Sequence, residues 1–276
     1  MKKQALGERL RDEGLAAEQK MALALIMAGQ VLVNDQPAYA GQRVGAVDQV
    51  RLKSPPQKYV AKGGLKLQGA LGQFSVSVAD QVCLDAGAST GGFTDCLLQH
   101  AARLVYAVDV GFGQLMGSLR QDPRVVNLER TNISHPALLR LDPAPTLATC
   151  DLSYLSLRDA IPVFFQILKG RGEIVALVKP LFETEDQLAR RSGILKETAY
   201  EPLLLSLINH LNLKEDIAIQ NICESPVRGN AGTIEFFLHI VPWVKSAKRN
   251  LDQEIKRSVE RAVETENYQK ATSEER

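Results

Sequence analysis

The sequence of 276 residues lacks any recognisable metal-binding or disulfide pattern. Its four cysteines (Cys83, Cys96, Cys150 and Cys223) never stand in C-x-x-C spacing, and its four histidines are equally scattered. This excludes the usual zinc knuckles and thioredoxin-like motifs, so we expect no metal site. Scattered thiols are typical of a reducing compartment, which predicts a cytoplasmic protein.

The sequence also lacks a long apolar run. Its longest notable one, residues 21–28, is far shorter than the roughly 18 residues of a membrane span. Polar and charged residues follow Met1 where a secretion signal would carry its apolar core. We therefore expect neither a membrane partner nor secretion.

Net charge is nearly absent as well, since 33 basic residues face 32 acidic ones. Any nucleic-acid binding must therefore depend on a local patch rather than on long-range attraction. One such patch exists, because residues 49–79 contain no acid and carry Arg51, Lys53, Lys58, Lys62 and Lys66. A solvated linker that happens to be basic is the alternative interpretation.

What is present is a globular composition, with 45% hydrophobic and 24% charged residues. The length favours about two domains. Residues 1–53 predict two helices and short strands, a small α+β domain; residues 54–63, with Pro55 and Pro56, predict a basic linker. Residues 64–244 form the larger domain, and residues 245–276 a charged C-terminal helix and tail.

The larger domain alternates strands and helices. We expect strands at 82–86, 104–110, 125–128, 147–152, 174–178, 217–222 and 233–240. Helical patterns lie between them, for example at 90–99, 157–168 and 199–211. Continuous apolar strands such as 174–178 are typical of parallel strands buried on both faces. The fold class is therefore α/β, with a doubly wound, mostly parallel, seven-stranded sheet.

The strongest local motif follows the first of these strands, where a glycine-rich loop opens a helix. Such a loop lets the backbone approach a ligand, and the next strand ends at Asp109, where a carboxylate typically accepts ribose hydroxyls. The alternative is a turn whose glycines serve packing only. The candidate cofactor-binding residues are Asp85, Gly87, Ser89, Thr90, Gly91, Gly92, Phe93 and Asp109.

The loop lacks the G-x-G-x-x-G spacing of dinucleotide sites, because it is G-A-S-T-G-G with Asp85 two residues ahead. S-adenosylmethionine has no phosphate and carries a cationic amino group, which an acid at the loop start suits. We therefore prefer this cofactor to NAD.

Four further residues stand in positions typical of a catalytic cluster. Lys66 lies on the helix before the first strand, Asp151 and Lys179 end two later strands, and Glu235 is a charge inside the last strand. Open α/β sheets bind ligands at the edge where Asp151 and Lys179 stand. Each residue also has a plain alternative, such as a helix cap for Asp151 or an edge-strand surface position for Glu235.

These residues together make the chain resemble the TlyA family of rRNA 2′-O-methyltransferases, whose catalytic domain is FtsJ-like. The matching stretches are residues 59–67, 84–93, 108–115, 128–132, 151–157 and 177–180. The N-terminal region resembles the S-four RNA-binding domain. Two departures are Glu18 and Gln19, where family members usually carry a Ser-Arg pair, and altered loops after Lys179 and at residues 228–233.

The resemblance implies a Rossmann-like methyltransferase sheet and a catalytic tetrad at Lys66, Asp151, Lys179 and Glu235. It also implies S-adenosylmethionine at residues 85–92 with Asp109 near its ribose. The implied partner is ribosomal RNA or a ribosomal subunit rather than DNA, and the implied target is a ribose 2′-hydroxyl, of cytidine in at least some members. The oligomeric state is left open.

We therefore expect methyl transfer to RNA. Lys179 would act as base or orient the hydroxyl, Asp151 would hold Lys179, and Glu235 would balance Lys66. Three alternatives remain: a non-catalytic RNA-binding or ribosome-assembly module, a haemolysin-like protein, and, last, a dinucleotide oxidoreductase.

Overall fold

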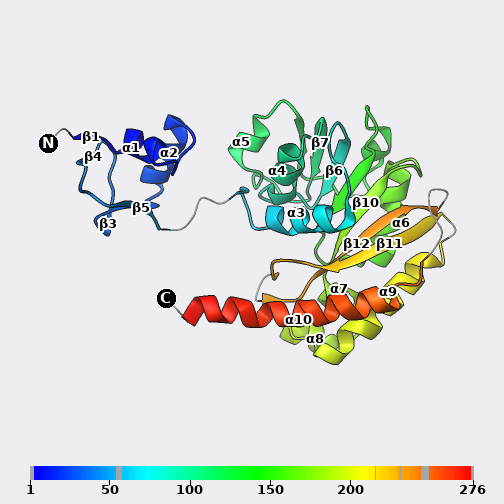
Figure 1. Cartoon of the computed structure of the whole chain (residues 1–276). Coiled ribbons are helices and arrows are strands. Elements are labelled where there is room, and N and C mark those ends of the chain that lie inside the picture. The colour runs from blue at the N-terminus through cyan, green and yellow to red at the C-terminus, as the bar shows by residue number, and fades with distance from the viewer. Residues whose placement is uncertain (1–2, 54–57, 215, 230–231, 244–248, 275–276) are drawn as a thin grey trace. The chain divides into compact units, whose positions relative to one another are not determined.

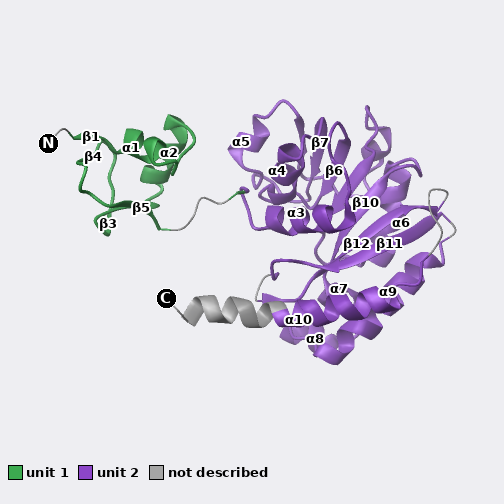
Figure 2. Cartoon of the chain, viewed as in Figure 1, with its two compact units in different colours: residues 1–58 green, residues 59–276 purple. Residues whose placement is uncertain are grey.

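The computed structural model describes residues 3–53, 58–214, 216–229, 232–243 and 249–274, with side chains as far as residue 264. The chain forms two compact units, residues 1–58 and residues 59–276 (Figure 2). The division lies within the segment 54–63, although Tyr59 is only 3% exposed and packs into the core of the second unit. An RNA-binding role for the first unit stays a prediction.

The first unit is built from two short helices and two small sheets (Figure 1). Its helices are α1 (Leu6–Asp12) and α2 (Gln19–Met27), and their buried residues pack with Val31, Val33 and Val44. Strands β1 (Gln4–Ala5) and β4 (Arg43–Val44) form one pair, and β3 (Gln36–Pro37), β2 (Val31–Val33) and β5 (Val50–Leu52) form the other sheet. Asn34 and Asp35, both with positive φ, form the turn between β2 and β3.

The second unit is organised around one seven-stranded sheet with the strand order β11-β12-β10-β9-β6-β7-β8. Five strands are parallel, and β12 runs antiparallel to both of its neighbours. The strands are β6 (Val82–Ala86), β7 (Leu104–Val108), β8 (Val125–Leu128), β9 (Leu147–Cys150), β10 (Glu173–Val178), β11 (Ile217–Glu224) and β12 (Phe236–Pro242). The predicted doubly wound, mostly parallel, seven-stranded sheet is confirmed.

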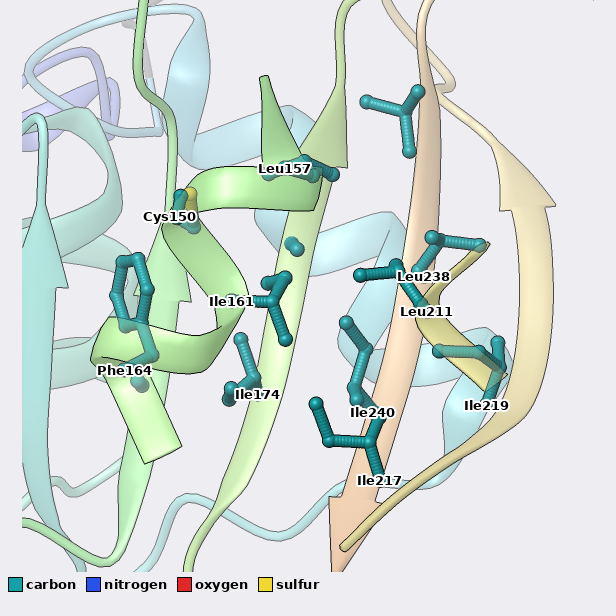
Figure 3. Packing of buried hydrophobic residues seen from close by; sticks show 14 of the residues in the cluster. Cys150, Leu157, Ile161, Phe164, Ile174, Leu211, Ile217, Ile219, Leu238 and Ile240 are labelled. Carbon is teal, nitrogen blue, oxygen red and sulfur yellow. The ribbon is translucent and has the colours of Figure 1, made fainter. Parts of the chain in front are cut away.

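Helices cover both faces of this sheet because alternate strand residues are apolar on both sides. On one face, α3 (Gly63–Phe74), α4 (Gly92–Gln99) and the short α5 (Gly117–Arg120) pack on Cys83, Val105 and Phe237. On the other, α6 (Leu157–Ile167) and α9 (Tyr200–Asn212) pack on residues such as Ile174, Leu238 and Ile240 (Figure 3). Short helices α7 (Pro180–Glu183), α8 (Gln187–Ser192), η1 (Pro136–Arg140) and η2 (Glu197–Ala199) complete the connections.

The C-terminal helix α10 (Asp252–Glu274) belongs to the second unit and is longer than the short helix expected from sequence. Leu251, Ile255 and Ala262 are almost fully buried in the same core as α9 and β11, with Val259 partly buried beside them. These apolar residues, spaced at helical intervals, therefore pack the C-terminal segment against the sheet. On the part of the helix whose side chains are described, Lys256, Arg257 and Glu260 are exposed.

Several predicted strand ends shift by a few residues, and one shift concerns the site. The last strand begins at Phe236 rather than at Thr233, so Glu235 stands directly before β12 and not inside it. Asp109 likewise follows the end of β7, which stops at Val108. Hydrogen bonding between strands decides these ends, and single-sequence patterns do not contain that information.

Candidate active site

The four residues selected as a catalytic cluster lie together in the structure. Lys66 Nζ is 2.5 Å from Glu235 Oε2, and Lys179 Nζ is 2.6 Å from Asp151 Oδ1. Lys179 also donates to Ser153 Oγ at 3.0 Å. The four side chains thus form two ion pairs, whose catalytic role stays a proposal.

Strand pairing explains why residues so far apart in sequence meet. Strands β9 and β10 are parallel neighbours, so their carboxyl ends, followed by Asp151 and Lys179, share one edge of the sheet. Strand β12 is antiparallel to β10 with Val178 opposite Phe236, which brings Glu235, just before β12, beside Lys179, just after β10. Helix α3 then supplies Lys66.

The two ion pairs differ in how far their side chains are buried. Lys66 and Glu235 are 9% and 6% exposed, and burial raises the pKa of the Glu235 carboxyl, while Lys66 and, more weakly, Lys179 oppose that rise. The Lys179 and Asp151 side chains are 19% and 25% exposed. Lys179 is therefore the more accessible ammonium, and the buried pair provides its electrostatic surroundings.

A cavity of about 480 Å³ opens directly beside this cluster. Lys179 and Glu235 line it, together with Tyr154, Phe182 and Arg228. The Tyr154 ring is 91% exposed and lies 5.1 Å from the Phe182 ring, between centroids. Volumes of this order suit a small organic group with aromatic and polar contacts, and a nucleoside falls in that class.

The glycine-rich loop after β6 approaches the β9 end closely. Gly87 has a φ of +86°, and a Cβ there would stand 2.3 Å from the Asp151 carbonyl oxygen. Gly91 has a φ of +101°, and its Cβ would meet Leu119 at 2.2 Å. Only glycine fits at both positions, whereas Ser89 and Thr90 between them are exposed.

Three of the predicted cofactor-binding residues lie beneath the loop instead of lining it. Asp85 is fully buried, and its carboxylate accepts hydroxyl hydrogen bonds from Thr94 (2.6 Å) and Thr149 (3.0 Å). Phe93 is 3% exposed and stacks on Phe237, and Gly92 lets α4 approach the start of α3. In the structure the apolar strand around Asp85 withdraws its carboxylate from solvent. Contact of this group with a ligand ammonium stays a prediction.

Burial also changes the chemistry of Asp85. It raises the pKa of the carboxyl to about 6, against the hydrogen bonds from Thr94 and Thr149 that lower it. Its carboxylate joins β6, β9 and α4 under the loop.

Asp109 holds the loop from the other side. Its carboxylate accepts the backbone N–H of Ser89 at 2.8 Å and that of Gly111 at 2.6 Å. A carboxylate has room for further donors, so Asp109, half-buried at the strand end, keeps acceptor capacity for hydroxyl groups. Next to it, Val110 and Phe112 are 69% and 66% exposed, and Arg130 stacks over the Phe112 ring at 4.1 Å.

Several residues of the site escaped the sequence analysis. Ser153, Tyr154 and Arg228 stand within motifs or loops that were noted, but their convergence on Lys179 depends on the fold. Glu183, a buried acid four residues after Lys179, likewise stands in a segment that was noted but was not itself selected.

Two features are absent from the described residues. No group of three or more His, Cys, Asp or Glu side chains there is arranged to hold a metal ion. None of the helices described has both the length and the apolar character needed to cross a membrane.

Comparison with known proteins identifies close relatives. The FtsJ-like methyltransferase family matches residues 59–241. A candidate rRNA methyltransferase of Bacillus subtilis, YqxC, is 38% identical over 98% of both chains. The 16S/23S rRNA (cytidine-2′-O)-methyltransferase TlyA of Mycobacterium tuberculosis is 36% identical over 82% of this chain and 85% of its own. The structure of a candidate hemolysin from Streptococcus thermophilus matches with a TM-score of 0.71 and 32% identity, over 98% of this chain and 99% of that one.

Proposed function

The chain belongs to the FtsJ-like methyltransferase family, as a relative of the TlyA enzymes, and we propose that it transfers a methyl group from S-adenosylmethionine to a ribose 2′-hydroxyl of ribosomal RNA. The observation that carries this proposal is the pairing of Lys66 with Glu235 and of Lys179 with Asp151 beside a nucleoside-sized cavity.

The loop after β6 fits S-adenosylmethionine. The exposed residues Ser89 and Thr90 would contact its methionine part, Asp109 would accept its ribose hydroxyls, and the exposed Val110 side chain would lie against its adenine. Asp85 would support the loop from below. The cofactor supplies a methyl group already activated by a sulfonium.

The enzyme's own task is then to hold and activate the hydroxyl. Lys179 lines the cavity, so we assign it the role of orienting the 2′-hydroxyl and, once it has lost its own proton, of receiving the proton that the hydroxyl releases as its oxygen takes the methyl group. Asp151 and Ser153 fix the Lys179 ammonium in place. The buried Lys66–Glu235 pair adds a fixed charge distribution around it.

Ribosomal RNA is the substrate class that the names of the relatives support, with cytidine as the target named for TlyA. The Tyr154 ring, exposed beside Phe182, suits stacking on an unpaired base. The 2′-hydroxyl requirement excludes DNA. The first unit and the exposed residues Arg51, Lys53, Lys58 and Lys62 would contact phosphates, whereas Lys66 of the same segment is buried. A protein that acts on ribosomal RNA would work in the cytoplasm.

Incubation of the purified protein with methyl-labelled S-adenosylmethionine and unmodified ribosomal subunits tests this function. We expect label in rRNA at a ribose 2′-oxygen. The modified nucleotide would be located as the one whose phosphodiester bond resists alkaline cleavage. Absence of label, with RNA binding intact, would instead favour the non-catalytic binding module. Binding of NAD without S-adenosylmethionine would favour the oxidoreductase, and lysis of red cells by the purified protein the haemolysin-like role.

The assignment of Lys179 has its own test. We expect Lys179→Ala to lower kcat by about 10²- to 10⁴-fold, the usual effect of removing a group that moves a proton. Binding of S-adenosylmethionine, measured by calorimetry, should change little because Lys179 lines the cavity and not the loop. Lys256→Ala, at an exposed position on α10, is the control. Methylation by Lys179→Ala at the normal rate would refute the role.

A further inference from the structure

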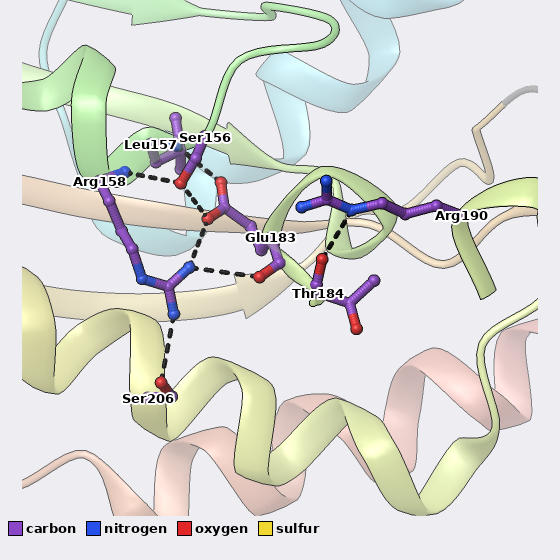
Figure 4. A network of polar contacts seen from close by, with 7 residues as sticks. All are labelled: Ser156, Leu157, Arg158, Glu183, Thr184, Arg190 and Ser206. Atoms are coloured by element: carbon purple, nitrogen blue, oxygen red, sulfur yellow. Dashed lines mark hydrogen bonds and ion pairs between the residues drawn. The ribbon is translucent and has the colours of Figure 1, made fainter. Parts of the chain in front are cut away.

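Glu183 is a buried acid that the methyl-transfer chemistry does not use. Its side chain is 1% exposed, yet it is fully hydrogen-bonded (Figure 4). Oε1 accepts the backbone N–H of Leu157 at 2.7 Å, and Oε2 accepts Ser156 Oγ at 2.7 Å and Arg158 Nη1 at 2.9 Å. We call Glu183 with residues 156–158 the Glu183 clamp.

The clamp joins the two segments that carry the accessible ion pair. Glu183 ends the short helix α7, which begins one residue after Lys179. Ser156 caps α6, five residues after Asp151, and accepts the backbone N–H of Arg158. The segments 151–156 and 179–183 are therefore tied at one end by Lys179 and Asp151 and at the other by Glu183.

The cavity wall depends on the same two segments. Tyr154 comes from the first and Phe182 from the second, and their rings lie 5.1 Å apart. Arg158 extends the connection to α9, where it donates to Ser206 Oγ at 3.2 Å. Every polar partner of the Glu183 carboxylate thus comes from the start of α6.

The energetics make this connection rigid. The first N–H groups of a helix have no partner within the helix, and a carboxylate there is also favoured by the helix dipole. A buried carboxylate that lost its partners would be strongly disfavoured, so the two segments separate only at high cost. The clamp therefore resists small displacements of Lys179 relative to Asp151.

We propose that Glu183, acting through the start of α6, is a positioning residue for methyl transfer: it sets the placement of Lys179 against Asp151 and of Tyr154 against Phe182. This inference rests on the proposed function. Displacements of about 1 Å in a catalytic group are enough to slow a reaction strongly, which is the effect that Glu183 prevents.

The test compares Glu183→Gln with Glu224→Gln in the full chain. The second variant weakens the Glu224–Arg261 pair, another carboxylate–arginine contact (2.8 and 2.9 Å) with a largely buried acid, between β11 and α10 and outside the cavity. With unmodified ribosomal subunits, we expect Glu183→Gln to lower kcat about ten-fold or more. Its Kd for S-adenosylmethionine should stay within about two-fold of the unaltered protein, as should both quantities in Glu224→Gln.

A merely structural role gives a different result. If Glu183→Gln only destabilised the fold, cofactor-binding stoichiometry would fall with kcat, and Glu224→Gln would show a similar loss at a similar melting temperature. Either outcome overturns the proposal. The double variant Glu183→Gln/Arg158→Met removes the arginine left without its carboxylate, so it should regain melting temperature without regaining kcat.

Hydrogen exchange separates this proposal from the proposed function. The Leu157 amide donates to Glu183 directly, so Glu183→Gln should speed its exchange and that of residues 151–156, whereas Glu224→Gln should not. Failure of the unaltered protein to methylate rRNA would refute the function and leave this readout intact. Unchanged exchange and unchanged kcat in Glu183→Gln would refute the clamp alone.

Discussion

Asp85 shows at the residue scale how burial changes a single carboxyl group. The sequence selected it as a ligand of a cationic cofactor, and the structure places it in the floor under the loop, hydrogen-bonded to Thr94 and Thr149. Its neighbours Ser89 and Asp109 stay accessible at the strand ends. Position along a strand therefore distinguishes a supporting acid from one that can meet a ligand.

The raised pKa of Asp85 predicts a pH-dependent stability. The pKa of Asp85 is about 6 in the folded protein and about 3.8, its ordinary value, in the unfolded chain. At pH values between these two, the folded protein keeps a proton that the unfolded chain has released. Stability from this group therefore falls as pH rises through that window, by roughly 2–3 kcal/mol in all, and stays constant above it.

Asp85→Asn removes this titration. The unfolding free energy of the variant minus that of the unaltered protein should therefore rise by roughly 2–3 kcal/mol from pH 4 to pH 7. Urea unfolding at several pH values measures the difference, and the matched control is Asp252→Asn at an exposed site on α10. Parallel pH profiles for Asp85→Asn and the unaltered protein would contradict the assigned pKa.

At the element scale, α10 shows that a highly charged segment can still be part of a core. Leu251, Ile255 and Ala262 are each no more than 4% exposed, whereas Lys256 and Arg257 face solvent. Arg228, which lines the cavity, donates to the Ala262 carbonyl oxygen at 2.7 Å.

We expect Ile255→Ala to lower the free energy of unfolding by about 2–5 kcal/mol, because it removes a buried side chain and leaves a cavity between α10 and the sheet. Denaturant unfolding provides the measurement. Arg257→Ala, two residues from Ile255 on the same helix but at an exposed position, should change stability by less than about 0.5 kcal/mol. An equally small effect of Ile255→Ala would show that α10 packs loosely.

At the scale of the whole molecule, each of the two units has its own hydrophobic core. Leu6, Leu10 and Val31 pack in the first, and the two faces of the large sheet supply the second. Separate cores are the condition under which parts of a chain fold independently. A division of labour between RNA contact and chemistry is consistent with this organisation.

This organisation predicts that residues 59–276 fold without residues 1–58. The fragment should unfold cooperatively and bind S-adenosylmethionine as the full chain does, since the proposed cofactor contacts all lie in the second unit. Its affinity for ribosomal subunits should be lower and less dependent on salt, because the phosphate contacts proposed for the first unit would be missing. Calorimetry and binding at 50 and 200 mM salt would measure both. An unfolded fragment would contradict independent folding.

The sequence by itself determined the class of fold and singled out the residues of the proposed catalytic cluster. Strands such as 174–178 are apolar throughout because both faces are covered, and that pattern is local. Lys66, Asp151, Lys179 and Glu235 could be selected because a charge next to an apolar strand is visible in sequence, and because the motifs around them resemble a known family. The two pairs expected among them, Asp151 with Lys179 and Glu235 with Lys66, are confirmed as ion pairs.

Only the tertiary structure decided how the paired residues are brought together and which residues face solvent. Val178 lies opposite Phe236 through pairing between strands 58 residues apart, and this register brings Glu235 to Lys179. The same packing buries Asp85 and Phe93 and leaves Tyr154 exposed. It also brings Glu183 to the start of α6, where its carboxylate accepts the backbone N–H of Leu157. These outcomes depend on long-range contacts, since the solvation of a side chain is set by the elements packed around it and not by its neighbours in the chain.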